Sequence, residues 1–123
     1  MSKIIFSILL LLLSKNVLAI DFLECINDIP INNSIIENKD SCFLFESNIG
    51  RIVSVEALSS QEYFEIEKFY KSILNQFGWF LSSAVNNKGL VFIREEEILK
   101  ISVKGINNKT LITYNSFLSL NIN

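Results

Sequence analysis

Residues 59–78 read SSQEYFEIEKFYKSILNQFG and carry the clearest local signal in the chain. The apolar side chains recur every three or four residues, as on one face of an amphipathic helix, at Ile66, Phe69, Tyr70, Ile73, Leu74 and Phe77. Ser59 and Glu62 have the spacing of a capping box, in which the serine hydroxyl accepts a hydrogen bond from the amide of Glu62. Gly78 stands where a left-handed C-cap is expected. The pattern predicts a helix over about 61–77.

Runs rich in β-branched and aromatic residues lie on both sides of this helix. The expected strands cover residues 42–46, 51–58, 79–85, 90–94 and 98–104, with 110–118 as an optional last strand. Turns containing Asn or Gly separate them at 47–50, 86–89 and 105–108. Within the second run Val53, Val55 and Ala57 share one face, which is the better candidate for the core.

These elements predict an α+β fold of the order ββαβββ(β). One amphipathic helix would lie on an antiparallel sheet, which makes two layers. The strands after the helix are expected to form a meander. Residues 41–123 would form this single domain, and residues 20–40, which show no sustained periodicity and contain Pro30, are expected to be an extended, loop-like lead-in.

The N-terminal residues 1–19 have the pattern of an export signal. Lys3 is followed by an apolar run over 4–13, and Ala19 ends a stretch that a signal peptidase can cleave before Ile20. An uncleaved signal that acts as an anchor is the open alternative. A spanning helix needs about 20 apolar residues, and this run is too short. A lipoprotein signal is rejected because Glu24 precedes Cys25.

Charge and residue usage exclude several function classes. Cleavage after Ala19 would leave nine basic and thirteen acidic residues, a net charge of −4, with no basic cluster. Nucleic acid is therefore not an expected partner. The chain has no histidine, so it lacks the Ser-His-Asp system and the common zinc sites. Its four glycines stand singly and form no phosphate loop. No cofactor is expected.

Cys25 and Cys42 are the two cysteines of the chain. In an oxidising compartment they are expected to form one disulfide, which would staple the lead-in to the domain. The alternative is a pair of unpaired thiols, one of them buried at Cys42.

Few residues are candidates for a ligand site. Glu95 and Glu97 could converge on an ion or act as general acid and base, but a solvated turn or strand edge is the more ordinary explanation. Arg51 and Arg94 could each clamp a carboxylate or phosphate, but pairing with a nearby glutamate such as Glu56 is more ordinary. The aromatic pairs at 69–70 and 79–80 fit core packing better than an interface.

Several short motifs resemble those of a group of small exported proteins of alphaproteobacteria. They are Phe45-Glu46-Ser47, Gly50-Arg51-Ile52, Phe69-Tyr70, Leu74, Gly78-Trp79, and Arg94-Glu95 followed by Glu97, Leu99 and Ile101. The resemblance covers about 42–103. It implies bacterial export, and it transfers no catalytic residue to this chain.

Together these observations predict an exported, periplasmic or secreted, non-enzymatic domain that binds another envelope protein or has a structural role. Once the signal is removed, no stable membrane span is expected. Two alternatives stay open: a carboxylate-dependent enzyme or ion-binding protein that uses Glu95 and Glu97, and a secreted inhibitor or effector.

Overall fold

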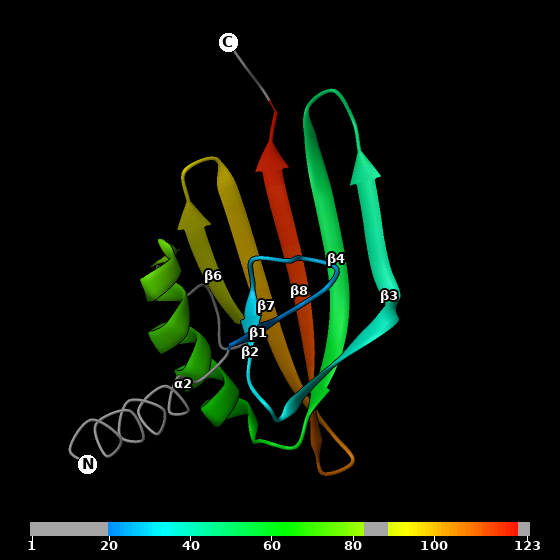
Figure 1. The fold of residues 1–123 in the computed structure, drawn as a ribbon, viewed down its shortest axis with the longest axis vertical. Helices are drawn as coiled ribbons and strands as arrows, with labels where there is room; N and C mark the ends of the chain where they lie inside the picture. Colours follow the sequence, from blue (N-terminus) through cyan, green and yellow to red (C-terminus); the bar gives the residue numbers. More distant parts are fainter. Residues whose placement is uncertain (1–19, 83–88, 121–123) are drawn as a thin grey trace, which may run out of the picture.

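The computed structural model describes residues 20–82 and 89–120 of the chain. The expected export signal at 1–19, its cleavage after Ala19, and most of the turn expected at 86–89 lie outside the described residues. Within the described residues the fold is α+β, with one helix, a six-stranded sheet and a small two-stranded sheet (Figure 1).

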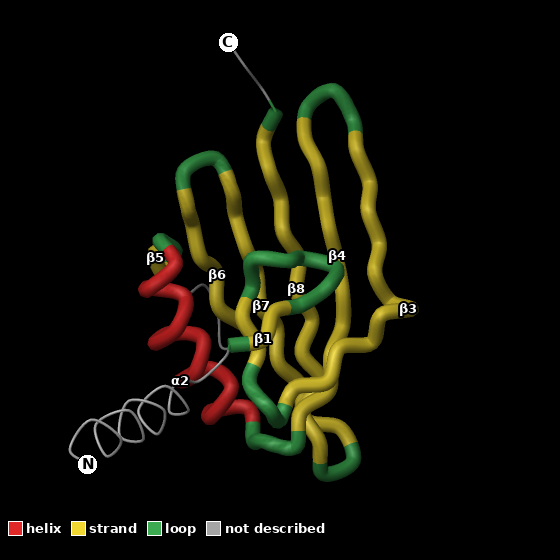
Figure 2. Tube along the Cα trace, in the orientation of Figure 1, coloured by secondary structure: helices red, strands yellow, loops and turns green. Residues whose placement is uncertain are grey.

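The larger sheet is antiparallel throughout and has the strand order β3-β4-β8-β7-β6-β5. Its strands are β3 (Ile35–Glu46), β4 (Gly50–Ser59), β5 (Phe80–Leu81), β6 (Gly89–Arg94), β7 (Glu97–Ile106) and β8 (Lys109–Ser119). Strands β5 to β8 form the expected meander. The optional last strand is central, because β8 pairs with β7 on one side and with β4 on the other. The two edges are therefore β3 and the short β5 (Figure 2).

Helix α2 (Tyr63–Ile73) continues into the 3-10 turn η1 (Leu74–Phe77), in agreement with the predicted range. Ile66, Tyr70 and Leu74 are fully buried, which confirms the predicted apolar face. Gly78 ends the helix in the left-handed conformation, with φ of 86°. This face of the helix packs on one side of the sheet, called here the inner face.

The predicted capping box is wrong. Glu62 is the N-cap of α2, and no side chain caps it. Ser59 is still the last residue of β4, and its buried hydroxyl accepts a hydrogen bond from Gln61 N at 3.0 Å. It also lies 2.7 Å from the hydroxyl of Ser34. The hydroxyl therefore satisfies the end of the strand instead of the start of the helix.

The lead-in differs most from its prediction. β3 begins at Ile35 and not at Cys42, and the preceding segment forms a hairpin of β1 (Asp21–Phe22) and β2 (Pro30–Ile31). The connecting loop lies on the inner face beside α2 (Figure 1). Leu23, Ile26 and Ile29 of this segment are buried in the main core. Isolated apolar residues in a polar segment thus build part of the core.

One turn and one bulge help to set the register of the sheet. Asn107 and Asn108, both at positive φ, close the β7–β8 hairpin, which is typical of a two-residue type I′ turn. The strand register shifts between Asn38 and Phe43. There the Ser41 hydroxyl accepts from Glu56 N at 2.8 Å and donates to Asn38 O at 2.6 Å. A side chain thereby replaces the missing backbone bond at the bulge.

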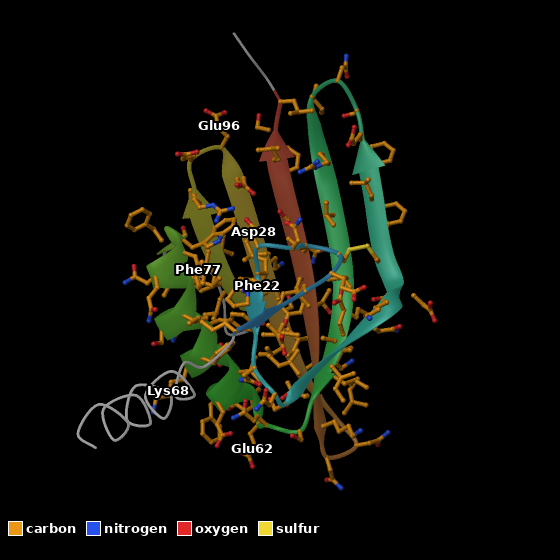
Figure 3. All side chains as sticks on the ribbon, viewed as in Figure 1. Phe22, Asp28, Glu62, Lys68, Phe77 and Glu96 are labelled. Atoms are coloured by element: carbon orange, nitrogen blue, oxygen red, sulfur yellow. A yellow bond between two sulfur atoms is a disulfide. The ribbon has the colours of Figure 1, made fainter. Side chains whose placement is uncertain are left out.

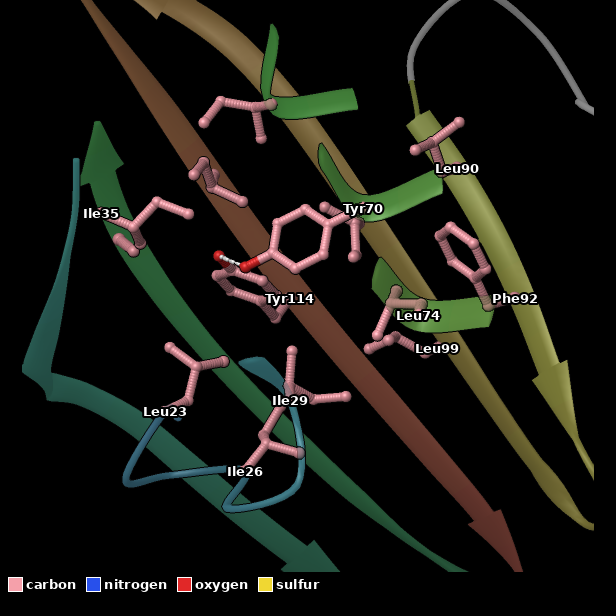
Figure 4. Close-up of a cluster of buried hydrophobic side chains, with 14 of the residues drawn as sticks. Leu23, Ile26, Ile29, Ile35, Tyr70, Leu74, Leu90, Phe92, Leu99 and Tyr114 are labelled. Carbon is pink, nitrogen blue, oxygen red and sulfur yellow. Dashed lines mark hydrogen bonds between the residues drawn. The ribbon is translucent and has the colours of Figure 1, made fainter. Parts of the chain in front are cut away.

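A buried pair of tyrosines joins the helix, the sheet and the lead-in. The hydroxyls of Tyr70 and Tyr114 lie 2.6 Å apart, and Tyr70 donates to Pro30 O at 2.9 Å (Figure 4). Burial raises the pKa of both hydroxyls well above their usual value of about 10. Both side chains therefore stay protonated in the folded state at pH values that ionise them in the unfolded chain.

We expect alkaline pH to destabilise the fold through this pair. Below about pH 10 both tyrosines are protonated in the folded and in the unfolded chain, so their contribution to the free energy of unfolding does not change with pH. Above this pH the unfolded state binds fewer protons, so stability falls by about 1.4 kcal/mol per pH unit for each tyrosine that stays protonated. Urea unfolding between about pH 8 and 11.5 measures this slope. In Tyr114→Phe, the part of this slope that the two tyrosines cause should be about half as large. The lysines are the same in both proteins, so the difference between the two slopes removes their contribution. An unchanged slope in Tyr114→Phe would contradict the assignment.

Candidate functional site

The inner face carries an open cavity of about 470 Å³ between the lead-in loop and the sheet. Ile26 and Asp28 line it from the loop. Leu44, Val53 and Leu118 contribute apolar side chains from β3, β4 and β8. Asp28 lies over the sheet beside β7 and β8 (Figure 3). The cavity therefore has an apolar floor and a partly polar rim, which is typical of ligand sites.

Two links hold the loop over the sheet. Cys25 and Cys42 form the predicted disulfide, with a Cα–Cα distance of 5.7 Å, and both line the cavity (Figure 3). The carboxylate of Glu37 accepts from Glu24 N at 2.7 Å and from Cys25 N at 2.9 Å. The wall of the cavity is thus fixed to β3 by a covalent bond and by two charge-assisted hydrogen bonds.

Arg94 connects three parts of the fold at the side of the cavity. Its guanidinium donates to Asp28 Oδ2, to Glu97 Oε1 at 2.9 Å and to Phe77 O at 3.3 Å. It also stacks on the Trp79 ring, 4.1 Å from the centroid. Burial lowers the pKa of Arg94, but the hydrogen bonds to the two carboxylates outweigh it and raise the pKa overall. Arg94 therefore stays charged, and it joins the lead-in loop, the end of the helix and strand β7.

The structure separates the predicted ligand candidates. Arg94 and Glu97 come together as an ion pair, which is the more ordinary of the two interpretations. Glu95 lies in the β6–β7 turn at φ of 53°, is exposed, and is not a lining residue of the cavity. In the part of the chain that the structure describes, no three acidic or cysteine side chains are grouped to hold a metal ion.

Arg51 is the sequence-predicted candidate that faces the cavity. It is exposed on β4 and lines the cavity beside Val53. Among residues 20–82 and 89–120, no carboxylate forms an ion pair with it. Glu46 is its neighbour across the hairpin, and Glu97 lines the same cavity. The Arg51 guanidinium is thus available to a ligand.

Sequence reasoning missed a second surface, on the outer face of the sheet. One apolar side chain from each strand joins a continuous line across it, called here the apolar row: Phe45, Ile52, Phe117, Ile98, Ile93 and Phe80. Phe45 and Ile52 are symmetric about the turn at 47–50, and Ile93 and Ile98 about the next β-turn. That symmetry is the signal that could have revealed four of the six members. Phe117 joins the row only through the pairing of β8 with β4 and β7, and Phe80 only through the pairing of β5 with β6.

Comparisons of the chain with protein-family models, with curated proteins and with solved structures find no match. Across the described ranges 20–82 and 89–120, the structure contains no helix of the length and apolar character needed to cross a membrane. The fold and the site thus define a small disulfide-stapled α+β domain with one open inner-face cavity and one apolar outer row.

Proposed function

We propose that this protein is an exported, non-enzymatic domain of a bacterial envelope that binds an acidic segment of another envelope protein in the inner-face cavity. The observation that carries the proposal is the exposed Arg51, which has no ion-pair partner among the described residues and lies at the rim of a cavity with an apolar floor. An arginine fork binds a carboxylate with two parallel hydrogen bonds. Leu44, Val53 and Leu118 would accept apolar side chains beside that carboxylate.

The chemistry of the cavity supports binding over catalysis. Asp28 and Glu97 already share the charge of Arg94. The chain has no histidine, the side chain whose ordinary pKa lies near neutral pH. General acid–base catalysis needs a group with such a pKa at hand. The carboxylate-dependent enzyme is thus the weaker proposal, and no observation favours the secreted inhibitor over the envelope domain.

Affinity capture from the native envelope tests the binding role. The tagged full-length chain should recover a partner in stoichiometric amount, and Arg51→Gln should reduce this recovery at least tenfold, because a charge-assisted hydrogen bond contributes about 1.5–3 kcal/mol. Lys104→Gln is the matched control, since Lys104 is an exposed basic residue of β7 outside the cavity lining. Equal recovery by both variants would contradict the proposed site.

Sequencing the N-terminus of the recovered chain tests export in the same preparation. A chain that starts at Ile20 is expected from cleavage after Ala19. A chain that still starts at Met1 would show that the N-terminal segment is retained, and the domain would then act as an anchored protein.

A further inference from the structure

The apolar row crosses the whole outer face at right angles to the strands. Its members are joined pairwise by register: Phe45 with Ile52, Ile52 with Phe117, Phe117 with Ile98, Ile98 with Ile93, and Ile93 with Phe80. Directly opposed side chains in antiparallel strands lie about 4.5–5.5 Å apart at Cβ. The six residues therefore form one contiguous apolar strip.

Most of this strip is accessible. The exposed fraction is 70% for Phe80, 53% for Phe45 and 43% for Ile98, and Phe117 is half-buried. Single exposed apolar residues are common on proteins, but a contiguous strip of six marks an interaction surface. The core lies on the opposite face of the sheet, where α2 and the lead-in loop pack.

Gly50 makes room for the Phe117 ring near the centre of the strip. The Phe117 ring lies over Gly50, where an added Cβ atom would come within 2.9 Å of the ring and 2.8 Å of Leu118 O. Because Gly50 has no side chain, the ring can lie against the backbone of β4. An apolar sheet face can pack against another sheet at a separation of about 10 Å.

We propose that the apolar row binds the apolar row of a second copy of this chain in a face-to-face, two-fold dimer. A two-fold axis along the row superposes the strip on itself, so that each of the six residues meets its own counterpart. The contact is then isologous and closes on itself without further growth. The strands of the two copies would run antiparallel across the interface.

The charges beside the row fit this axis. Along β7, Lys100 follows Ile98 by two residues, and Glu96 precedes Ile98 by two residues in the turn. When Ile98 lies on the axis, Lys100 of each copy comes opposite Glu96 of the other copy. Lys100 and Glu96 are both exposed, so these two pairs would lie at the rim of the interface.

The size of the strip fits a weak dimer. A half-exposed aromatic residue can bury roughly 100 Å² more, so the six residues would cover roughly 500 Å² per copy. The total of about 1,000 Å² is at the lower limit for a specific interface. We therefore expect a dissociation constant on the order of 10 μM.

Analytical ultracentrifugation of the oxidised full chain, expressed for export, tests the dimer. The unsubstituted protein should be dimeric at about 300 μM, thirty-fold above the expected dissociation constant. Ile98→Glu should weaken association at least thirty-fold. Ile36→Glu is the matched control, because Ile36 is an exposed residue of the same face beyond the row and should leave association unchanged. Thermal melts of both variants verify that they are folded.

The charge pair tests the axis. Lys100→Glu and Glu96→Lys should each weaken the dimer about threefold to tenfold, and the double variant should restore it. A monomer at about 300 μM would overturn the proposal, as would equal effects of Ile98→Glu and Ile36→Glu. Failure of the double variant to restore association would overturn the axis along the row. Arg51→Gln should not change association, so the outcome is independent of the cavity.

Discussion

Replacing Cys25 and Cys42 together by serine should lower the free energy of unfolding by about 3 kcal/mol. The disulfide closes a loop of 17 residues in the unfolded chain, and its loss returns that freedom to the unfolded state. In a domain of this size the melting temperature should fall by roughly 10–20 °C. Reduction of the unsubstituted protein should have the same effect.

The measurement is a thermal melt of the oxidised protein, the reduced protein and the double serine variant. Ser41→Ala, next to Cys42, controls for a change at the β3 bulge that leaves the disulfide intact. If the oxidised protein and the double variant melt together, and both thiols react with an alkylating agent, the disulfide is absent from the protein in solution.

Local pattern was sufficient for the helix and for the hairpin that precedes it. Ile66, Tyr70 and Leu74 are buried because their spacing places them on one helical face, and Gly78 ends the helix because it adopts a left-handed conformation readily. Val55 and Ala57 are buried because side chains alternate along a strand. These predictions needed no knowledge of the rest of the chain.

The remainder depends on contacts between residues that are distant in sequence. The optional last strand is central only because β8 inserts between β4 and β7. In the site, Arg94 and Glu97 are partners across one turn, so their pairing could be expected, whereas Asp28 and Arg94 are 66 residues apart. The capping box failed for a related reason, because Ser59 belongs to β4, where it pairs with Ile35 and Thr110, both distant in sequence.

The lead-in shows most clearly how a weak pattern can build a core. Leu23, Ile26 and Ile29 stand three residues apart in a segment that forms neither helix nor long strand, so neither periodicity predicts their burial. Backbone hydrogen bonds from Leu23 N to Ile29 O at 2.9 Å and from Ile29 N to Ile26 O at 3.1 Å shape the loop. This geometry points all three side chains into the core (Figure 4).

Ile29→Ala should therefore destabilise the domain by about 3–4 kcal/mol, although Ile29 lies in a loop. Its side chain is fully buried, so the substitution removes apolar contacts and leaves a cavity below the loop. The neighbouring Pro30 O accepts the Tyr70 hydroxyl, and this hydrogen bond restrains the loop from collapsing into the space. Urea unfolding at neutral pH gives the free energy.

Ile36→Ala is the control for Ile29→Ala, because it removes the same atoms from a side chain that is 73% exposed. It should change the free energy of unfolding by less than about 0.5 kcal/mol. If Ile29→Ala also costs less than about 1 kcal/mol, the loop is peripheral and the core is complete without it. A large difference between the two isoleucines would instead establish that the stapled lead-in is part of the fold and that the cavity has a rigid wall.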